Sequence, residues 1–189
     1  NMLNIVLFGP PGAGKGTQAE RIKNQYSLVH LSTGDIFRAN IKGATDLGLM
    51  AKKYMDKGEL VPDEVTIKML ESEVNKYPDS SGFIFDGFPR TTHQARKLDE
   101  FLISKSISIT KMIALDVPQQ ELIKRLLSRG KASGRADDQN KDIIANRIKV
   151  YENQTAVLAD YYKAQNKLLK VNGTGTVDEV TDRLYHVID

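Results

Sequence analysis

A glycine-rich segment near the first residues carries the groups needed to bind phosphate. It reads GPPGAGKGT over residues 9–17, between the apolar run Leu3–Phe8 and a helical pattern that begins at Lys15. Glycines let the backbone turn so that successive N–H groups converge on phosphate oxygens at a helix N-terminus. Lys15 adds a charge that can follow a transferring phosphoryl group. Strand, spacing and lysine together predict a phosphate-binding loop rather than a glycine-rich turn with an unrelated lysine.

A metal ion at this loop would need a different partner from the usual one. The residue after Lys15 is Gly16, and the hydroxyl that commonly binds Mg²⁺ comes one position later, at Thr17. Asp86 follows the apolar run Phe83–Phe85, and ligands of open α/β sheets bind at such carboxyl ends of strands. A carboxylate there can hold Mg²⁺ through the waters that this ion retains. The alternative is that Asp86 caps the turn that follows it.

Short apolar runs alternate with helical patterns along the chain. The runs predicted as strands are Leu3–Phe8, Leu28–Leu31, Phe83–Phe85, Met112–Leu115 and Leu168–Val171. The helical patterns are Lys15–Gln25, Asp35–Ile41, Leu47–Lys57, Asp63–Asn75, Thr91–Ser104, Gln119–Arg129, Ile143–Gln165 and Val177–Val187. This alternation predicts βαβ units, and hence an α/β fold in which helices cover both faces of a five-stranded parallel sheet.

Two stretches interrupt the alternation. Residues 32–62 hold helical patterns but no strand, and residues 130–140 read GKASGRADDQN, with small residues on both sides of an arginine. Long excursions from a compact sheet are often lids, although ordinary surface loops have a similar composition. We expect a single domain over residues 1–189, with a core of 1–31, 62–125 and 141–189, an insertion at 32–61 and a short lid at 126–140.

The composition narrows the class of protein. A chain of 189 residues with a net charge of +3 and no long run of one sign gives no reason to expect binding to nucleic acid. The absence of cysteine excludes disulfides and cysteine-ligated zinc. No apolar run reaches the length of a membrane span. We therefore expect a cytoplasmic protein without a membrane partner, and a monomer because the sequence shows no dimer seam.

Four further segments resemble the pattern of the adenylate kinase family, in order and at suitable spacing. They are STGDIFR at 32–38, GELVPD at 58–63, FDGFPR at 85–90 followed by Gln94, and SGRADD at 133–138. The likeness covers essentially the whole chain and is to the short-lid forms, because the long-lid forms often carry four zinc cysteines. It implies a P-loop NTPase type of sheet, phosphoryl transfer between Mg²⁺·ATP and AMP to give ADP, and no zinc.

The resemblance gives roles to six of the nine arginines. Guanidinium groups suit crowded phosphates because they are always charged and bind oxyanions in a fork. By resemblance, Arg38 and Arg90 hold the AMP phosphate, and Arg125 and Arg129 reach the ATP phosphates from one helix face. For any one arginine alone, a solvated side chain is the commoner explanation. The residues implied as catalytic are Lys15, Arg90, Arg129, Arg135 in the lid and Arg147 on the long helix.

The resemblance also places the two nucleotides. It implies an ATP site of Gly12, Ala13, Gly14, Lys15, Gly16, Thr17, Arg125, Arg129 and Gly175. It implies an AMP site of Thr33, Arg38, Glu59, Leu60, Val61, Gly87, Phe88, Pro89, Arg90, Gln94, Arg135 and Arg147, with Mg²⁺ held through water by Asp86. Within the AMP site, the amide of Gln94 can pair with an adenine edge.

Two alternatives stay open. Pyrimidine monophosphate kinases resemble this chain, but they typically carry alanine at the position of Thr33 and Asn-x-x-Asn where this chain has TTHQ at 91–94. The other alternative is a nucleotide-dependent switch without transferase activity. Against it, NKDI at 140–143 has the wrong order for a guanine-binding signature, and a switch has no need of a second phosphate site.

Overall fold

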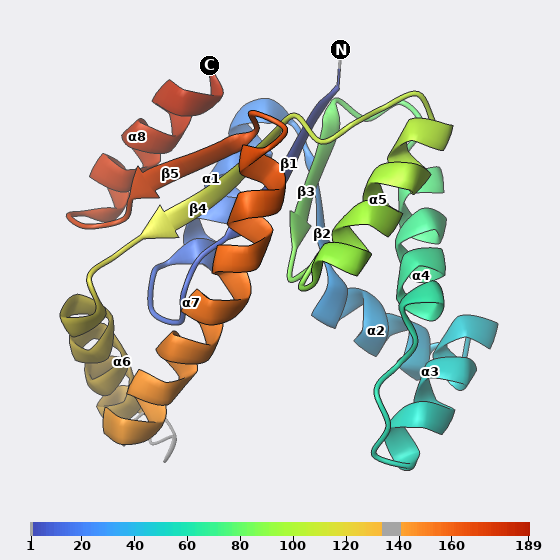
Figure 1. The fold of residues 1–189 in the computed structure, drawn as a ribbon, viewed down its shortest axis with the longest axis horizontal. Helices are drawn as coiled ribbons and strands as arrows, with labels where there is room; N and C mark the ends of the chain where they lie inside the picture. Colours follow the sequence, from blue (N-terminus) through green and yellow to red (C-terminus); the bar gives the residue numbers. More distant parts are fainter. Residues whose placement is uncertain (1, 134–140) are drawn as a thin grey trace.

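Within residues 2–133 and 141–189, which the computed structural model describes, five parallel strands form one sheet in the order β2-β3-β1-β4-β5 (Figure 1). The strands are β1 (Leu3–Phe8), β2 (Val29–Ser32), β3 (Gly82–Asp86), β4 (Lys111–Asp116) and β5 (Leu168–Asn172). The predicted α/β fold with a five-stranded parallel sheet is confirmed. In this order β1 has β3 and β4 as neighbours, so the phosphate loop that follows β1 lies at the switch point of the sheet.

Helices cover both faces of the sheet. They are α1 (Lys15–Tyr26), α2 (Thr33–Lys42), α3 (Asp46–Asp56), α4 (Asp63–Asn75), α5 (Thr92–Ser104), α6 (Gln119–Ser133), α7 (Lys141–Lys163) and α8 (Val177–Ile188). Figure 1 shows α5 and α7 in front of the sheet and α1 behind it. It also shows α6 and the pair α2–α3 on opposite sides below the carboxyl ends of the strands. The predicted insertion and the part of the predicted lid that belongs to α6 thus lie near the carboxyl ends of the strands.

Alternation along β1 divides the core into two layers. Val6 and Phe8 belong to the cluster that packs under α4, α5 and the end of α7, whereas Ile5 and Leu7 belong to the cluster under α1, α6 and α8. Because successive side chains of a strand point to opposite faces, a strand buried on both faces reads as an unbroken apolar run. This is why the strands were visible in the sequence.

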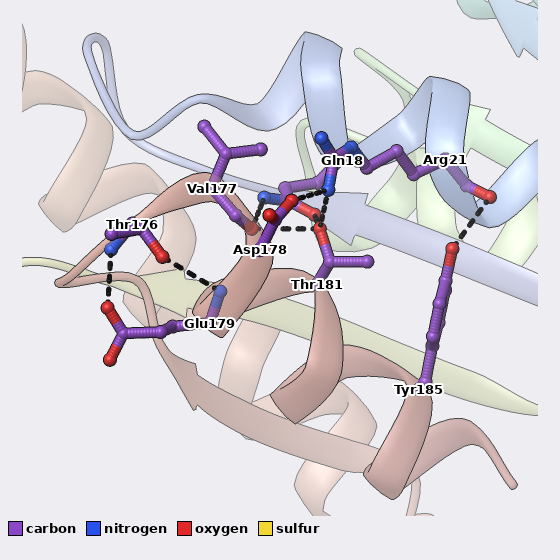
Figure 2. A network of polar contacts seen from close by, with 8 residues as sticks. All are labelled: Gln18, Arg21, Thr176, Val177, Asp178, Glu179, Thr181 and Tyr185. Carbon is purple, nitrogen blue, oxygen red and sulfur yellow. Dashed lines mark hydrogen bonds and ion pairs between the residues drawn. The ribbon is translucent and has the colours of Figure 1, made fainter.

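Side-chain hydrogen bonds join α8 to α1, the helix that begins at the phosphate loop (Figure 2). Buried Gln18 donates from Nε2 to the Val177 carbonyl at 3.1 Å, and its Oε1 lies 2.8 Å from the hydroxyl of buried Thr181. Arg21 donates to Asp178 at 2.7 Å and to the Thr181 hydroxyl at 3.0 Å. These contacts hold α1 in place beneath the loop.

One helix boundary differs from the prediction in a region of functional interest. The helix expected to end at Arg129 continues to Ser133, because the glycine at 130 costs only about 1 kcal/mol in a helix and Lys131 and Ala132 after it are strong helix formers. The predicted lid, which starts at residue 126, thus shares residues 126–133 with α6. Residues 134–140, including Arg135, lie outside the described residues.

No helix in the described part of the chain combines the length and the apolar character that crossing a bilayer would require.

Candidate active site

A cavity of about 630 Å³ lies against the phosphate loop. Residues 8–17 form one wall, from the last residue of β1 to the first turn of α1. Four arginines line it from three other segments: Arg90 follows β3, Arg125 and Arg129 come from α6, and Arg147 comes from α7. The cavity therefore brings together most of the cationic groups that the sequence singled out.

The loop depends on glycine at two positions. Gly12 and Gly14 have φ angles of +88° and +81°, in the region that side chains with a Cβ rarely adopt. A Cβ on Gly12 would also lie 3.0 Å from Cγ of Leu126 in α6. Gly14 is the N-cap of α1, and the first N–H groups of a helix have no intrahelical acceptor. The first turn of α1 thus offers donors to an anion in the cavity.

Lys15 is paired with the carboxylate expected to bind metal. Its Nζ lies 2.5 Å from Oδ1 of Asp86, and Nε2 of His30 lies 2.9 Å from Oδ2 of the same carboxylate. Burial raises the pKa of the Asp86 carboxyl. The hydrogen bonds from His30 and Lys15 outweigh that effect, so the pKa lies below its ordinary value. Asp86 is therefore a carboxylate at neutral pH, only 13% exposed, at the edge of the loop.

The residues around Asp86 fit a Mg²⁺ ion that arrives with a nucleotide. Each carboxylate oxygen has two lone pairs, so each keeps one acceptor position for a metal-bound water beside its present partner. Among the described residues, no group of three or more His, Cys, Asp or Glu side chains could hold a metal by itself. Phosphate oxygens and water would thus supply most of the ligands, as is usual for Mg²⁺.

Arg125 connects the phosphate loop to the turn after β5. It donates to the carbonyl of Gly12 at 3.3 Å and to that of Gly173 at 3.2 Å, and Nε donates to Glu121 at 3.1 Å. Gly175, which was also predicted as part of the ATP site, does not line the main cavity. It lines a neighbouring depression together with Glu121 and Thr174.

Three residues of the predicted AMP site lie at or next to the main cavity, on the side of β3. Nε of Arg90 donates to the Gly87 carbonyl at 2.9 Å, and Gly87 also lines the cavity. The hydroxyl of buried Thr33 lies 3.4 Å from the Asp86 carbonyl, and a Cβ on Gly87 would come within 2.8 Å of that hydroxyl. Thr33, Gly87 and Arg90 are therefore brought together by the ends of β2 and β3.

Other predicted acceptor residues are not part of the main cavity. Arg38 is 73% exposed and paired with Asp35 one helical turn away, and Leu60 is 93% exposed. Glu59, Val61, Phe88 and Pro89 do not line the cavity, and the last two are buried. Their roles in binding stay predictions.

Among the residues that contact predicted site residues, sequence reasoning missed His30 and Asp63. His30 received no role because the histidines of the sequence form no evident metal or base cluster, yet its ring contacts the carboxylate of Asp86 across the β2–β3 pair. Asp63 accepts a hydrogen bond from Nε2 of Gln94 at 2.8 Å. For His30, the available signal was a polar side chain inside the predicted strand Leu28–Leu31. For Asp63, a charged first residue of a helix is too common to indicate a role.

Comparison with known proteins agrees with this arrangement. The family model described as adenylate kinase matches residues 7–167. The adenylate kinase of Flavobacterium psychrophilum is 60% identical over 188 residues, covering 100% of this chain and 99% of the relative. That of Flavobacterium johnsoniae is 58% identical and that of Bacteroides fragilis 49% identical, with the same coverage. Similarity thus extends over the full length of these relatives, and the chain belongs to the adenylate kinase family.

Proposed function

We propose that this protein catalyses reversible, Mg²⁺-dependent phosphoryl transfer between ATP and AMP, giving two ADP. The observation that carries the proposal is the convergence of Lys15, Arg90, Arg129 and Arg147 on one cavity. Arg90 belongs to the segment that also contains Gln94, whereas the other three come from the phosphate loop, α6 and α7. Groups suited to a donor phosphate and groups suited to an acceptor phosphate thus meet at one place.

Each nucleotide has a proposed set of contacts. ATP binds to residues 12–17, Arg125, Arg129 and Gly175. AMP binds to Thr33, Arg38, residues 59–61 and 87–90, and Gln94, with Arg135 and Arg147 approaching both phosphates. The nearness of Thr33, Gly87 and Arg90 to the cavity supports this division.

Catalysis in this proposal is alignment and stabilisation of charge. The AMP phosphate is already ionised, so no side chain has to remove a proton from it. Lys15 and the arginines of the cavity balance negative charge on the oxygens of the transferring group. Bound Mg²⁺ supplies further charge neutralisation and orients the phosphates. Asp86 would hold it through water, and Lys15 would move from Asp86 to the nucleotide.

Closure of the flanking segments forms the last part of the proposal. The insertion at 32–61 and the lid at 126–140 close over the bound nucleotides and exclude water, which would otherwise accept the phosphoryl group. Two observations support this role: α6 lines the cavity, and α2–α3 lie across from α6 below the carboxyl ends of the strands (Figure 1).

The test is a comparison of acceptors. The protein is mixed with ATP, Mg²⁺ and AMP, UMP, CMP or GMP, and the appearance of each diphosphate is followed to obtain kcat/KM. We expect AMP to give the highest value. A pyrimidine monophosphate that equals or exceeds AMP would make the protein a pyrimidine nucleotide kinase, and formation of no diphosphate from any acceptor would favour a switch.

A variant tests the assignment of the acceptor base. Gln94→Ala should lower kcat/KM for AMP, because the base loses a matched polar partner. The expected loss of transition-state stabilisation is about 1–3 kcal/mol. The KM for ATP should hardly change. Gln25→Ala, at an exposed position of α1, is the matched control and should behave like the wild type. Unchanged AMP kinetics in Gln94→Ala would contradict the assignment.

A further inference from the structure

The side-chain amide of Gln94 is held at both ends by partners of opposite character. Its Nε2 donates to Oδ1 of Asp63 at 2.8 Å, and its Oε1 accepts from the backbone N–H of Arg90 at 2.8 Å. A carboxylate can only accept hydrogen bonds, and a backbone N–H can only donate them. The two contacts therefore define which end of the amide is oxygen and which is nitrogen.

The carboxylate of Asp63 is itself held in place. Nδ1 of His93 lies 2.7 Å from Oδ2, which leaves Oδ1 for Gln94. Asp63 is the first residue of α4, where a negative charge is favourable, and its side chain does not cap the helix, because the N-cap is Pro62. The side chain is 28% exposed. Asp63 thus connects the start of α4 to the start of α5 through a carboxylate of fixed orientation.

A fixed amide can read a base in only one way. A Gln side chain offers a donor and an acceptor side by side, and rotation by 180° exchanges them. One orientation matches the adenine edge, which presents a donor at N6 and an acceptor at N1. The other matches the hypoxanthine edge, which presents an acceptor at O6 and a donor at N1. A freely rotating Gln would accept both bases, because it could turn to suit either.

Rotation of Gln94 in this structure would break both anchoring contacts. Oε1 would face the Asp63 carboxylate, which is an acceptor against an acceptor, and Nε2 would face the Arg90 N–H, which is a donor against a donor. In the observed orientation, one N–H and one lone pair of the amide remain for a ligand. The anchored amide is thereby restricted to one hydrogen-bonding pattern.

We propose that Asp63 is a specificity-determining residue, which makes the acceptor site selective for the adenine pattern by fixing the orientation of the Gln94 amide. This inference rests on the proposed function, in which Gln94 contacts the base of AMP. Asp63 acts as a positioning residue: it touches Gln94 and not the nucleotide. The ligand class selected is a 6-amino purine monophosphate against a 6-oxo purine monophosphate.

The experiment compares AMP with inosine monophosphate (IMP), whose base presents the opposite pattern at positions 6 and 1. In Asp63→Asn, the new amide can donate to Oε1 of a rotated Gln94, so one of the two contacts that oppose rotation is removed and only the Arg90 N–H still disfavours it. The ratio of kcat/KM for AMP to kcat/KM for IMP should fall at least about tenfold, the factor that corresponds to one net hydrogen bond. Equal losses with both acceptors, leaving the ratio unchanged, would mean that Asp63 is only structural and would overturn the proposal.

A double variant tests whether the effect passes through Gln94. In a Gln94→Ala background, Asp63→Asn should leave the ratio unchanged, because the amide that it orients is gone. A fall of the same size in that background would overturn the proposal. Asp178→Asn is the matched control, since it removes another first-turn acid, 84% exposed at the start of α8, and should keep the wild-type ratio.

The unmodified protein provides a second measurement, which is independent of how well the variants fold. CMP presents a donor at N4 and an acceptor at N3, as adenine does at N6 and N1, whereas UMP presents the opposite pattern. Residual activity should therefore be higher with CMP than with UMP, and the reverse order would overturn the proposal. A wild-type protein that does not phosphorylate AMP would instead refute the proposed function itself, together with the inference that rests on it.

Discussion

Replacement of Lys15 by Met separates a catalytic role of the phosphate loop from a structural one. The change removes the ammonium group but keeps an unbranched side chain in the first turn of α1. In the structure, that ammonium is paired with Asp86 at 2.5 Å. In the proposed reaction it stabilises the transferring phosphoryl group. The variant therefore loses one interaction in the resting protein and a different one in the transition state.

The two losses differ in size. Side chains in the resting pair are 30% and 13% exposed, so solvent screens the interaction in part, and His30 stays on the carboxylate. We expect a loss of about 1 kcal/mol in the free energy of unfolding. Removal of one preorganised charge stabiliser from a transition state costs about 4 kcal/mol, which is about 10³-fold in kcat, and more where it is the main charge.

The assay is a coupled measurement of ADP formation from ATP and AMP, together with urea unfolding of the same protein. Lys23→Met is the matched control, since Lys23 lies on the same helix and forms only a 3.7 Å pair with Glu20. Lys15→Met should lose turnover and keep most of its stability, whereas Lys23→Met should keep both. Near-normal turnover in Lys15→Met would refute the reasoning about the loop. A stability loss as large as the catalytic loss would show that the lysine serves the fold.

Three further predictions follow from the site and its support. Two adenosines linked through five phosphates should bind far more tightly than ATP or AMP by calorimetry, because one ligand then fills two adjoining sites; affinity no better than that of ATP would argue against adjoining sites. The pKa of Asp86 is lower in the folded protein than in the unfolded chain, where it is about 3.9. The stabilisation that the Asp86 carboxylate contributes is therefore present above the unfolded pKa and is lost as pH falls through the folded pKa. Urea unfolding from pH 6 to pH 3 should therefore show a shallower acid decline for Asp86→Asn than for the wild type, and parallel curves would contradict the assignment. Thr181→Val should lower the free energy of unfolding by about 1–3 kcal/mol, because Gln18 loses a buried partner. Its kcat should stay close to the wild-type value, because neither residue lines the cavity, and a loss of kcat without a loss of stability would contradict this.

The elements of the fold were predictable because their signals are local. The three central strands are mostly buried on both faces and therefore appear as continuous apolar runs, as in Leu3–Phe8, whereas the edge strands β2 and β5 are less buried. Helix limits deviated where a cap decides them. The hydroxyl of Ser32 accepts from the N–H of Asp35, so α2 begins at Thr33, two residues before the predicted start. The end of α6 deviated because strong helix formers after residue 130 carry the helix past one glycine.

The order of the strands in the sheet could not be predicted from local sequence patterns, yet this order decides which residues meet in the site. The pairing of β1 with β3 sets Leu7 opposite Asp86, and the pairing of β3 with β2 sets Ser32 opposite Asp86. Only this order brings Lys15, after β1, and His30, on β2, to the same carboxylate. The sequence predicted that Asp86 would end a strand. It could not predict that the carboxylate would be shared between two cationic partners, because those contacts join residues 71 and 56 positions away.

The contact between Asp63 and Gln94 shows the same limit for specificity. The sequence identified Gln94 as a residue able to pair with adenine, but an amide by itself is compatible with either hydrogen-bonding pattern. What restricts it is a carboxylate 31 positions earlier and a backbone N–H four positions earlier, which meet only when the starts of α4 and α5 pack together. Residue type therefore tells which bases a side chain could contact. The neighbours supplied by the fold tell which of them it is oriented to accept.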